Sequence, residues 1–198
     1  MDVNKALAAF KAKGWETAYF ETKEEAADFI AASISGKSVG IGGCQTAEQL
    51  GLFEKLSENN QVIWHWKQPA DEARKAAMSA DVYICSANGM SETGEIVNID
   101  GAGNRVASTL FGHEELYIVA GVNKLMPDLD GAIWRARNVA APKRAKSMNK
   151  NTPCTVKLDK CYDCCSPDRI CRGMSILMQP MMGMKKSVIV LINEELGM

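Results

Sequence analysis

The sequence predicts an α/β protein with a mostly parallel sheet and helices on both of its faces. Short apolar segments rich in β-branched and aromatic residues alternate with amphipathic segments of helical period along most of the chain. Such alternation is typical of units in which a helix crosses over the sheet between two parallel strands. The length of 198 residues suits one domain, and no linker-like stretch interrupts it. We therefore expect a single domain over residues 1–198.

The first part of the chain gives the clearest alternation. Helices are expected at 2–13, 22–34, 46–56 and 69–78, and strands at 15–20, 37–41, 62–66 and 82–85. The second helix has the strongest start signal, because Thr22 and Glu25 form the T-x-x-E pattern of a capping box. Ala47, Leu50 and Phe53 fall on one face of the third helix, so this helix is expected to pack on the sheet.

The later part is regular only up to about residue 137. We expect strands at 95–99, 116–121 and 187–192, and helices at 106–111 and 128–137. Between residues 140 and 184 no period is evident: a basic stretch leads into an irregular cysteine-rich segment at about 150–175 and then a methionine-rich run. The five methionines from Met174 to Met184 favour an adaptable packing surface or a contact in a homo-oligomer.

Composition excludes several classes of function. The chain has 23 basic and 24 acidic side chains and no basic stripe with interleaved aromatics, so we expect no nucleic-acid partner. No apolar run approaches the ~20 residues of a membrane span, and the N-terminus lacks signal-peptide character, so a cytoplasmic protein with no membrane association is expected. Seven cysteines in such a chain favour reduced or metal-bound thiols over disulfides.

A glycine motif follows the strand at 37–41. The sequence V-G-I-G-G-C-Q-T places Gly42, Gly43, Cys44 and Thr46 between a strand and a helix, where backbone N–H groups can approach phosphate or carboxylate. The spacing is neither G-x-G-x-x-G nor a P-loop, so a nicotinamide or Mg-nucleotide site is not supported. A tight packing turn explains the glycines equally well.

Polar residues are concentrated after the buried strand at 82–85. Asn88, Glu92, Thr93 and Gly94 lie in one turn, and loops at strand ends carry the chemistry of α/β proteins. Glu92 is our candidate catalytic residue, as general base, nucleophile or partner of a ligand amine. The alternative is an acid that stabilises the turn.

A second polar group follows at Asp100, Asn104 and Arg105. The guanidinium of Arg105 is suited to hold a carboxylate or phosphate through two parallel hydrogen bonds. A structural ion pair between Asp100 and Arg105 accounts for the same residues.

The cysteine-rich segment is a candidate metal site. Cys161 and Cys164 have C-x-x-C spacing, Cys165 is adjacent, and Cys154 and Cys171 flank them. Thiolates favour zinc or an iron–sulfur cluster, although the pattern is neither a zinc ribbon nor a ferredoxin motif. Cysteines also pack as small buried hydrophobic residues, so metal or redox chemistry and packing both remain open.

The motifs together resemble one family. The stretch S-A-N-G-M-S-E-T-G-E-I-V-N-I-D-G-A-G-N-R-V-A, with I-V-A-G-V-N-K and R-N-V-A-A-P after it, resembles the LUD-domain family, named for lactate utilisation. G-G-C-Q-T-A-E-Q-L-G-L resembles its early glycine motif, which usually has Ser where Cys44 stands. C-Y-D-C-C-S-P-D-R-I-C resembles the cysteine segment of its short, single-domain members, so the resemblance covers nearly the whole chain.

This resemblance implies a fold like that of ribose-5-phosphate isomerase and the CoA transferases, with a ligand at the C-terminal strand edge. It implies a role in oxidation of L-lactate to pyruvate, a small anionic ligand, and iron–sulfur oxidoreductase proteins as partners. By analogy with the glutamate nucleophile of CoA transferases, 42–46 and 92–94 would face one pocket. Whether the protein is an enzyme stays open. The alternatives are a metal-binding or iron–sulfur electron-transfer component and a sugar-phosphate isomerase or CoA/acyl-transferring enzyme.

Overall fold

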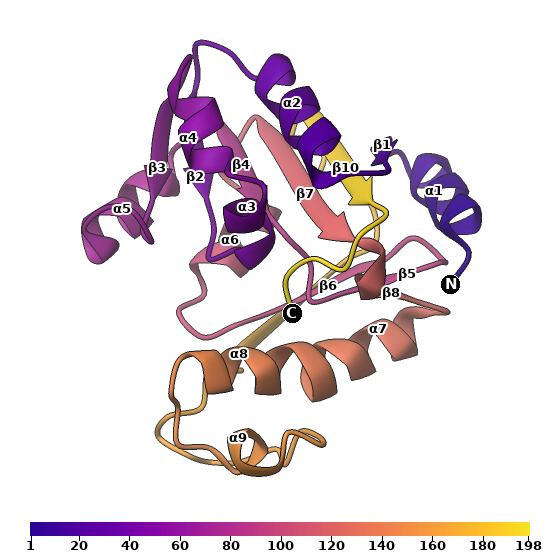
Figure 1. The fold of residues 1–198 in the computed structure, drawn as a ribbon, viewed down its shortest axis with the longest axis vertical. Coiled ribbons are helices and arrows are strands. Elements are labelled where there is room, and N and C mark those ends of the chain that lie inside the picture. The colour runs from indigo at the N-terminus through magenta and orange to yellow at the C-terminus, as the bar shows by residue number, and fades with distance from the viewer.

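A six-stranded parallel sheet forms the centre of the computed structural model, which describes residues 1–198 (Figure 1). This sheet confirms the predicted fold class. Its strands lie in the order β1-β10-β7-β4-β2-β3, and every neighbouring pair is parallel. The strands are β1 (Glu16–Phe20), β2 (Ser38–Ile41), β3 (Gln61–Trp64), β4 (Val82–Cys85), β7 (Glu115–Gly121) and β10 (Lys186–Ile192). All six were predicted, because strands buried on both faces read as continuous apolar runs.

Helices cover both faces of this sheet. One face carries α2 (Lys23–Ser33), α3 (Gln45–Gln49) and α4 (Leu52–Ser57), and the other carries α1 (Val3–Ala12), α5 (Ala70–Ala77) and α6 (Asn104–Leu110). The predicted capping box is present: the Glu25 N–H donates to the Thr22 hydroxyl, and the Thr22 N–H donates to the Glu25 carboxylate. The helix predicted at 46–56 is instead two helices, because Gly51 adopts a left-handed φ of 63° between them.

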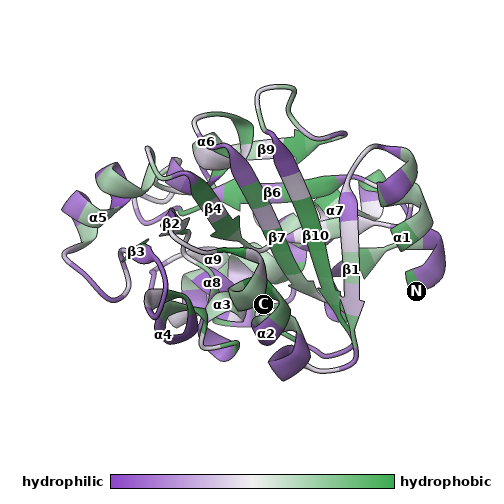
Figure 2. Ribbon diagram, turned by 90° about the horizontal axis from the view of Figure 1, so that it is seen from above, coloured by the Kyte–Doolittle hydropathy of each residue, from purple (hydrophilic) through white to green (hydrophobic).

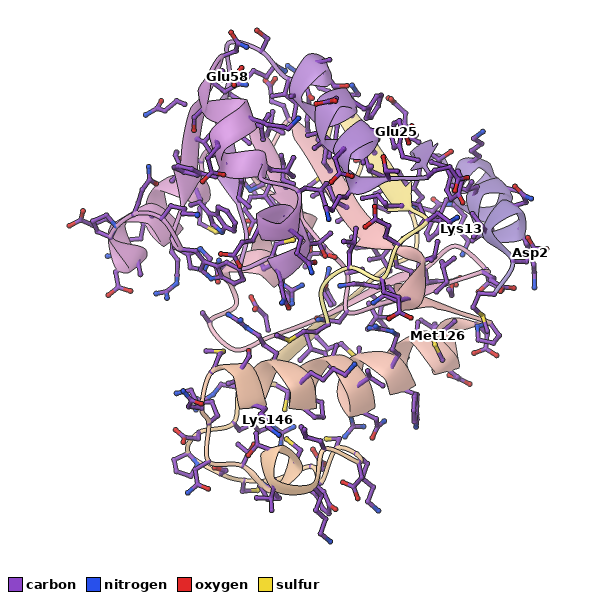
Figure 3. All side chains as sticks on the ribbon, viewed as in Figure 1. Asp2, Lys13, Glu25, Glu58, Met126 and Lys146 are labelled. Carbon is purple, nitrogen blue, oxygen red and sulfur yellow. The ribbon has the colours of Figure 1, made fainter.

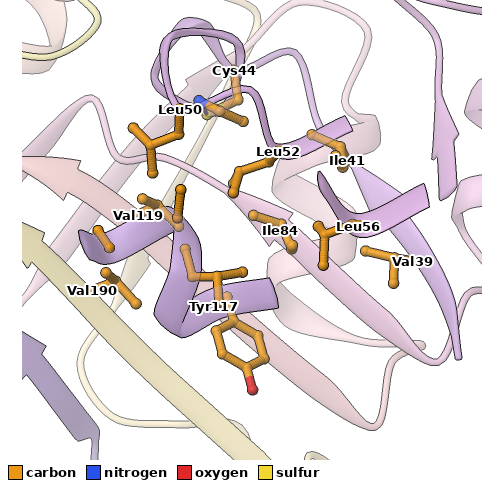
Figure 4. Close-up of a cluster of buried hydrophobic side chains, with 14 of the residues drawn as sticks. Val39, Ile41, Cys44, Leu50, Leu52, Leu56, Ile84, Tyr117, Val119 and Val190 are labelled. Carbon is orange, nitrogen blue, oxygen red and sulfur yellow. Dashed lines mark hydrogen bonds between the residues drawn. The ribbon is translucent and has the colours of Figure 1, made fainter. Parts of the chain in front are cut away.

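The larger hydrophobic core lies between the sheet and helices α2 to α4. Figure 4 shows Leu50, Leu52 and Leu56 from the helical side facing Ile84 and Val119 of the strands. Burial of one such side chain stabilises the fold by about 1.5–3 kcal/mol. In Figure 2, β4 and the later parts of β7 and β10 are hydrophobic, whereas α1, α2 and α5 carry both hydrophobic and hydrophilic residues.

A second, four-stranded sheet covers part of the other face, in the order β8-β5-β6-β9. It consists of β5 (Gly89–Ser91), β6 (Ile96–Asp100), β8 (Leu125–Met126) and β9 (Gly173–Leu177). Of these, only β6 was predicted. β9 lies in the methionine-rich run and is defined by its antiparallel pairing with β6, from Gly173 opposite Asp100 to Leu177 opposite Ile96.

A long helical segment packs on the outer face of this second sheet (Figure 1). It begins as α7 (Leu129–Arg135), continues through one π-helical stretch (Ala136–Ala140) and ends as α8 (Ala141–Ser147). Ala132 and Ala136 contact Val97 of β6. Beyond α8 the cysteine-rich segment contains one short helix, α9 (Pro153–Lys157), and then no helix or strand until β9, as its irregular sequence predicted.

None of the helices is both long enough and apolar enough to cross a lipid bilayer.

Candidate functional site

A cavity of about 440 Å³ lies at the carboxyl ends of the central strands. Each of four strands delivers residues to it just past its last residue: Gly43 after β2, His65 after β3, Ser86 after β4 and Lys124 after β7. This is the edge at which open parallel sheets bind their ligands. Another side of the cavity is closed by α8 and by residues at the end of the cysteine-rich segment, from Pro167 to Arg172.

The cavity is strongly basic. Two carboxylate side chains line it, Asp100 and Asp168, against seven cationic ones: Arg74, Arg105, Lys124, Arg144, Lys150, Arg169 and Arg172. The Asp100 carboxylate accepts the backbone N–H groups of Arg105 and Val106, so it already has hydrogen-bond partners within the fold. A concave site with this excess of cations attracts anions.

Lys124 has the most unusual environment of the seven. Its side chain is only 3% exposed, it lines the cavity, and it makes no ion pair or hydrogen bond with any other side chain or carbonyl. Burial lowers the pKa of Lys124 to about 7, with nearby Arg135 and Arg105 lowering it further. A buried ammonium group without a partner is costly, so this lysine destabilises the ligand-free fold.

Arg105 is also buried, but its guanidinium is occupied. One terminal nitrogen donates to the Asn98 Oδ1 at 2.7 Å and to the Ser86 carbonyl at 3.3 Å. The other donates to the Asn88 Oδ1 at 2.9 Å and the Ile99 carbonyl at 2.6 Å. The predicted two-bond grip on an anion is therefore not available, and Arg105 instead ties the loop after β4 to β6. Its nearest carboxylate oxygen, on Asp100, is 4.0 Å away.

The glycine motif reaches the cavity only in part. Gly43, Cys44 and Thr46 line it, whereas Gly42 does not. Gly42 lies against Tyr83, whose hydroxyl would be 2.8 Å from an added Cβ, so its lack of a side chain serves packing. The Cys44 sulfur accepts the Ala47 N–H at 3.3 Å and caps α3, and the Thr46 hydroxyl donates to Ser86.

Part of the cavity lining is aromatic and lies beside Gly43. Trp66 and His65 line the cavity, and the Arg144 guanidinium lies 4.9 Å from the centre of the Trp66 ring. Such stacking holds an arginine while leaving its N–H groups free for a ligand. Burial, followed by the charge of Arg74, lowers the pKa of His65, so this imidazole is neutral at pH 7.

The structure does not bring Glu92, Thr93 or Gly94 to the cavity. The Glu92 carboxylate accepts the Asp2 N–H at 2.7 Å and pairs with Lys5 at 3.2 Å, while its backbone N–H donates to Met126. Asp2 and Met126, both labelled in Figure 3, lie at the end of the molecule away from Lys146 of α8. The predicted juxtaposition of Glu92 with the glycine motif is thus corrected: this turn fastens α1 to the second sheet.

We expect Glu92→Gln to lower the midpoint of thermal unfolding and to leave anion binding unchanged. The Asp2 N–H and then Lys5 hold the pKa of Glu92 below its ordinary value, so the charge contributes stability at neutral pH and loses that contribution as the pH falls into the acid range. Thermal melts at pH 7 and in acid measure the effect. Glu54→Gln, which removes an exposed pair with Lys67, is the control. Loss of anion binding with an unchanged melting midpoint would restore Glu92 as a catalytic candidate.

Four of the five cysteines in the irregular segment line a second, small cavity. These are Cys154, Cys161, Cys164 and Cys171, whereas Cys165 is exposed. No group of three or more His, Cys, Asp or Glu side chains has metal-coordination geometry in this structure.

Several residues of the main cavity were not singled out from the sequence. Asn88, Asp100, Asn104 and Arg105 of the site prediction line this cavity, but the prediction omitted Lys124, Arg74, Arg144 and Arg172. Lys124 carries a usable signal, because it is the first charged residue after the buried strand β7 and strand ends of a parallel sheet converge on the ligand. The arginines come from helices and loops whose approach only the fold defines.

Fold and site together define an α/β protein with a large basic cavity at the carboxyl ends of parallel strands. The sequence model of the LUD domain matches residues 3–192, and the chain belongs to the LUD domain family. A solved DUF162 family protein from Deinococcus radiodurans aligns over 97% of this chain and 99% of its own, with a TM-score of 0.56 and 13% identity, which supports the fold. Ribose 5 phosphate isomerase A from Neisseria gonorrhoeae aligns over 54% of each chain, with a TM-score of 0.36 and 15% identity. No curated protein matched the sequence.

Proposed function

We propose that this protein binds a small organic anion in the basic cavity and serves organic-acid metabolism, in the oxidation of L-lactate to pyruvate. The observation that carries the proposal is Lys124, a buried ammonium group that faces the cavity without a partner. A bound carboxylate supplies the missing counter-charge, so the unfavourable burial of the lysine is offset when the ligand binds. The excess of cations around the cavity supports the same assignment, and the family's association with lactate utilisation suggests the ligand class.

The lining divides into two parts with different roles. The Lys124 ammonium and the Thr46 hydroxyl both lie next to Gly197. The Thr46 and Ser86 hydroxyls lie 3.3 Å apart and provide neutral donors in the same lining. Arg144 and Arg172 come from α8 and the later segment, and they increase the local concentration of anions. Because the pKa of Lys124 lies near 7, this amine can also accept or release a proton at neutral pH.

A phosphate-bearing ligand is the second candidate, and the size of the cavity favours it. Its 440 Å³ falls within the range of about 300–1,000 Å³ that holds drug-sized ligands, which is more than a three-carbon acid needs. Several well-separated arginines would suit a ligand with more than one anionic group. The candidates here are a sugar phosphate or the phosphate-rich part of CoA.

A thermal-shift series distinguishes these ligands. L-lactate, pyruvate, ribose 5-phosphate, CoA and sodium sulfate are each titrated against the protein at pH 7 and constant ionic strength. A ligand present at 100 times its Kd should stabilise the fold by about 2.7 kcal/mol. We expect an organic acid to raise the melting midpoint at lower concentration than sulfate does. If no organic anion stabilises the protein more than sulfate, the proposal is wrong.

A further inference from the structure

The small cavity under the cysteine-rich segment has an unusual lining. Of its eleven residues, four are cysteines, drawn from two ends and the middle of an eighteen-residue stretch: Cys154, Cys161, Cys164 and Cys171. Cys165 is adjacent to Cys164 in sequence, but it is exposed and lies outside the lining. The fold therefore separates the five cysteines into four that share one cavity and one that does not.

We propose that Cys154, Cys161, Cys164 and Cys171 bind one zinc ion as a tetrathiolate site. Zinc in structural sites is four-coordinate and tetrahedral, with Zn–S distances of about 2.3 Å. The spacing is symmetric, since six residues separate each outer cysteine from the central C-x-x-C pair.

Two of the four sulfurs, those of Cys154 and Cys161, lie beside hydrogen-bond donors. The Asp163 N–H donates to the Cys161 sulfur at 3.3 Å, from a turn in which Asp163 adopts a left-handed φ of 44°. An Arg137 guanidinium nitrogen lies 4.0 Å from the same sulfur, and the Thr152 hydroxyl lies 3.3 Å from the Cys154 sulfur. Donors and cations beside metal-bound sulfurs offset the net negative charge of a tetrathiolate centre.

The size of the cavity favours a single ion over a cluster. Its volume is about 20 Å³, which corresponds to little more than the ~10–15 Å³ that holds one water molecule. Coordination requires the four sulfurs to move inwards, because they do not have metal geometry in this structure. Cys154 lies in the short helix α9, whereas the chain from α9 to β9, which carries the other three cysteines, contains no helix or strand. Small backbone shifts of these three therefore break no regular structure, and Cys154 needs a side-chain rotation.

The zinc site would also hold in place part of the lining of the basic cavity. Arg169 and Ile170, between Cys164 and Cys171, line both cavities. Arg169 donates to the Cys164 and Cys171 carbonyls at 2.7 and 2.8 Å, and the Arg172 N–H donates to the Asp100 carbonyl at 2.9 Å. Bound zinc thus holds two cavity arginines in place. This second part rests on the proposed function, whereas zinc binding itself does not.

Metal analysis of the whole protein tests the site. We expect wild-type protein reconstituted with zinc and then desalted to retain one ion per chain, and cobalt to give intense thiolate-to-metal charge-transfer absorption. Cys161→Ser and Cys171→Ser should each weaken zinc binding by at least about 100-fold, more than the loss of an outer-shell partner. Cys165→Ser, one residue from a proposed ligand, is the matched control and should retain wild-type affinity.

Three results would overturn the zinc site: no retained metal, iron with acid-labile sulfide in place of zinc, or equal losses in Cys165→Ser and Cys161→Ser. Far-UV circular dichroism of each variant shows whether the fold survives. If a variant unfolds, protection of wild-type Lys157 and Lys160 from trypsin by added zinc, and its absence without zinc, tests the same point. Removal of zinc should weaken anion binding; unchanged anion affinity would refute the coupling while leaving the metal site intact.

Discussion

Lys124→Met is expected to weaken binding of the organic anion by roughly 10- to 100-fold, because a hydrogen bond to a charged group contributes about 1.5–3 kcal/mol. Methionine has a similar length and keeps the apolar contacts of the lysine stem, so the change removes the ammonium group and little else. Isothermal titration calorimetry with the tightest anion of the thermal-shift series measures the effect. Lys143→Met, at an exposed lysine of α8 outside the cavity, should bind like the wild type.

The same variant should be more stable than the wild type when no ligand is present. The folded-state pKa of Lys124 is about 7, against about 10.4 for an unfolded lysine, so folding carries a penalty of roughly 2–4 kcal/mol at pH 7. The unfolded chain binds more protons between these values, so wild-type stability rises with pH across the interval. The advantage of Lys124→Met should therefore shrink from pH 7 towards pH 10, as measured by urea unfolding.

A variant that loses both binding and stability would contradict this account of Lys124. Such a result would mean that the lysine makes contacts that hold the ligand-free fold together. Gain of stability with unchanged binding would equally remove Lys124 from the site, because the buried charge would then have no role in holding the anion.

Arg105→Met is expected to destabilise the protein by roughly 2–5 kcal/mol, because each buried acceptor left unsatisfied costs about 1–3 kcal/mol. Four acceptors lose the Arg105 donor: the Ser86 and Ile99 carbonyls and the side-chain oxygens of Asn88 and Asn98. The two side-chain oxygens still accept the backbone N–H groups of Ile99 and Asn88. Arg105→Lys should recover only part of the loss, because an ammonium group does not match the two-sided arrangement of acceptors. Chemical unfolding reports the free energies.

Arg74→Met is the control for Arg105, because Arg74 also lines the basic cavity but pairs only with exposed Asp71. Its removal should change stability by no more than about 1 kcal/mol. If Arg105→Met is as stable as Arg74→Met and loses anion binding, then Arg105 grips the ligand directly, as its sequence context first suggested.

Elements with local signals were predictable from the sequence. The Thr22–Glu25 capping box is formed as expected, and the apolar run of β7 lies buried in the sheet. β9 was not predictable, because its register comes from pairing with β6, more than seventy residues earlier in the chain. Its strand character is a property of the partner as much as of its own residues.

The candidate site was predictable as an edge of the sheet but not as a set of side chains. Strand ends converge in any parallel sheet, and the predicted residues Gly43, Asn88 and Asp100 line the cavity at that edge. Glu92 follows a strand of the second sheet instead, and α1 covers it. From the sequence, all five cysteines are equally good candidates for metal ligands. Only the fold distinguishes exposed Cys165 from the four that line the small cavity.

The central claim is that Lys124 holds an organic anion in the basic cavity, and a crystal structure with the tightest anion of the thermal-shift series tests it most directly. We predict electron density for the ligand between Lys124 and Arg144, with an anionic oxygen within about 2.7–2.9 Å of the Lys124 nitrogen. An anion bound elsewhere, with the Lys124 ammonium still unpaired, would contradict the account.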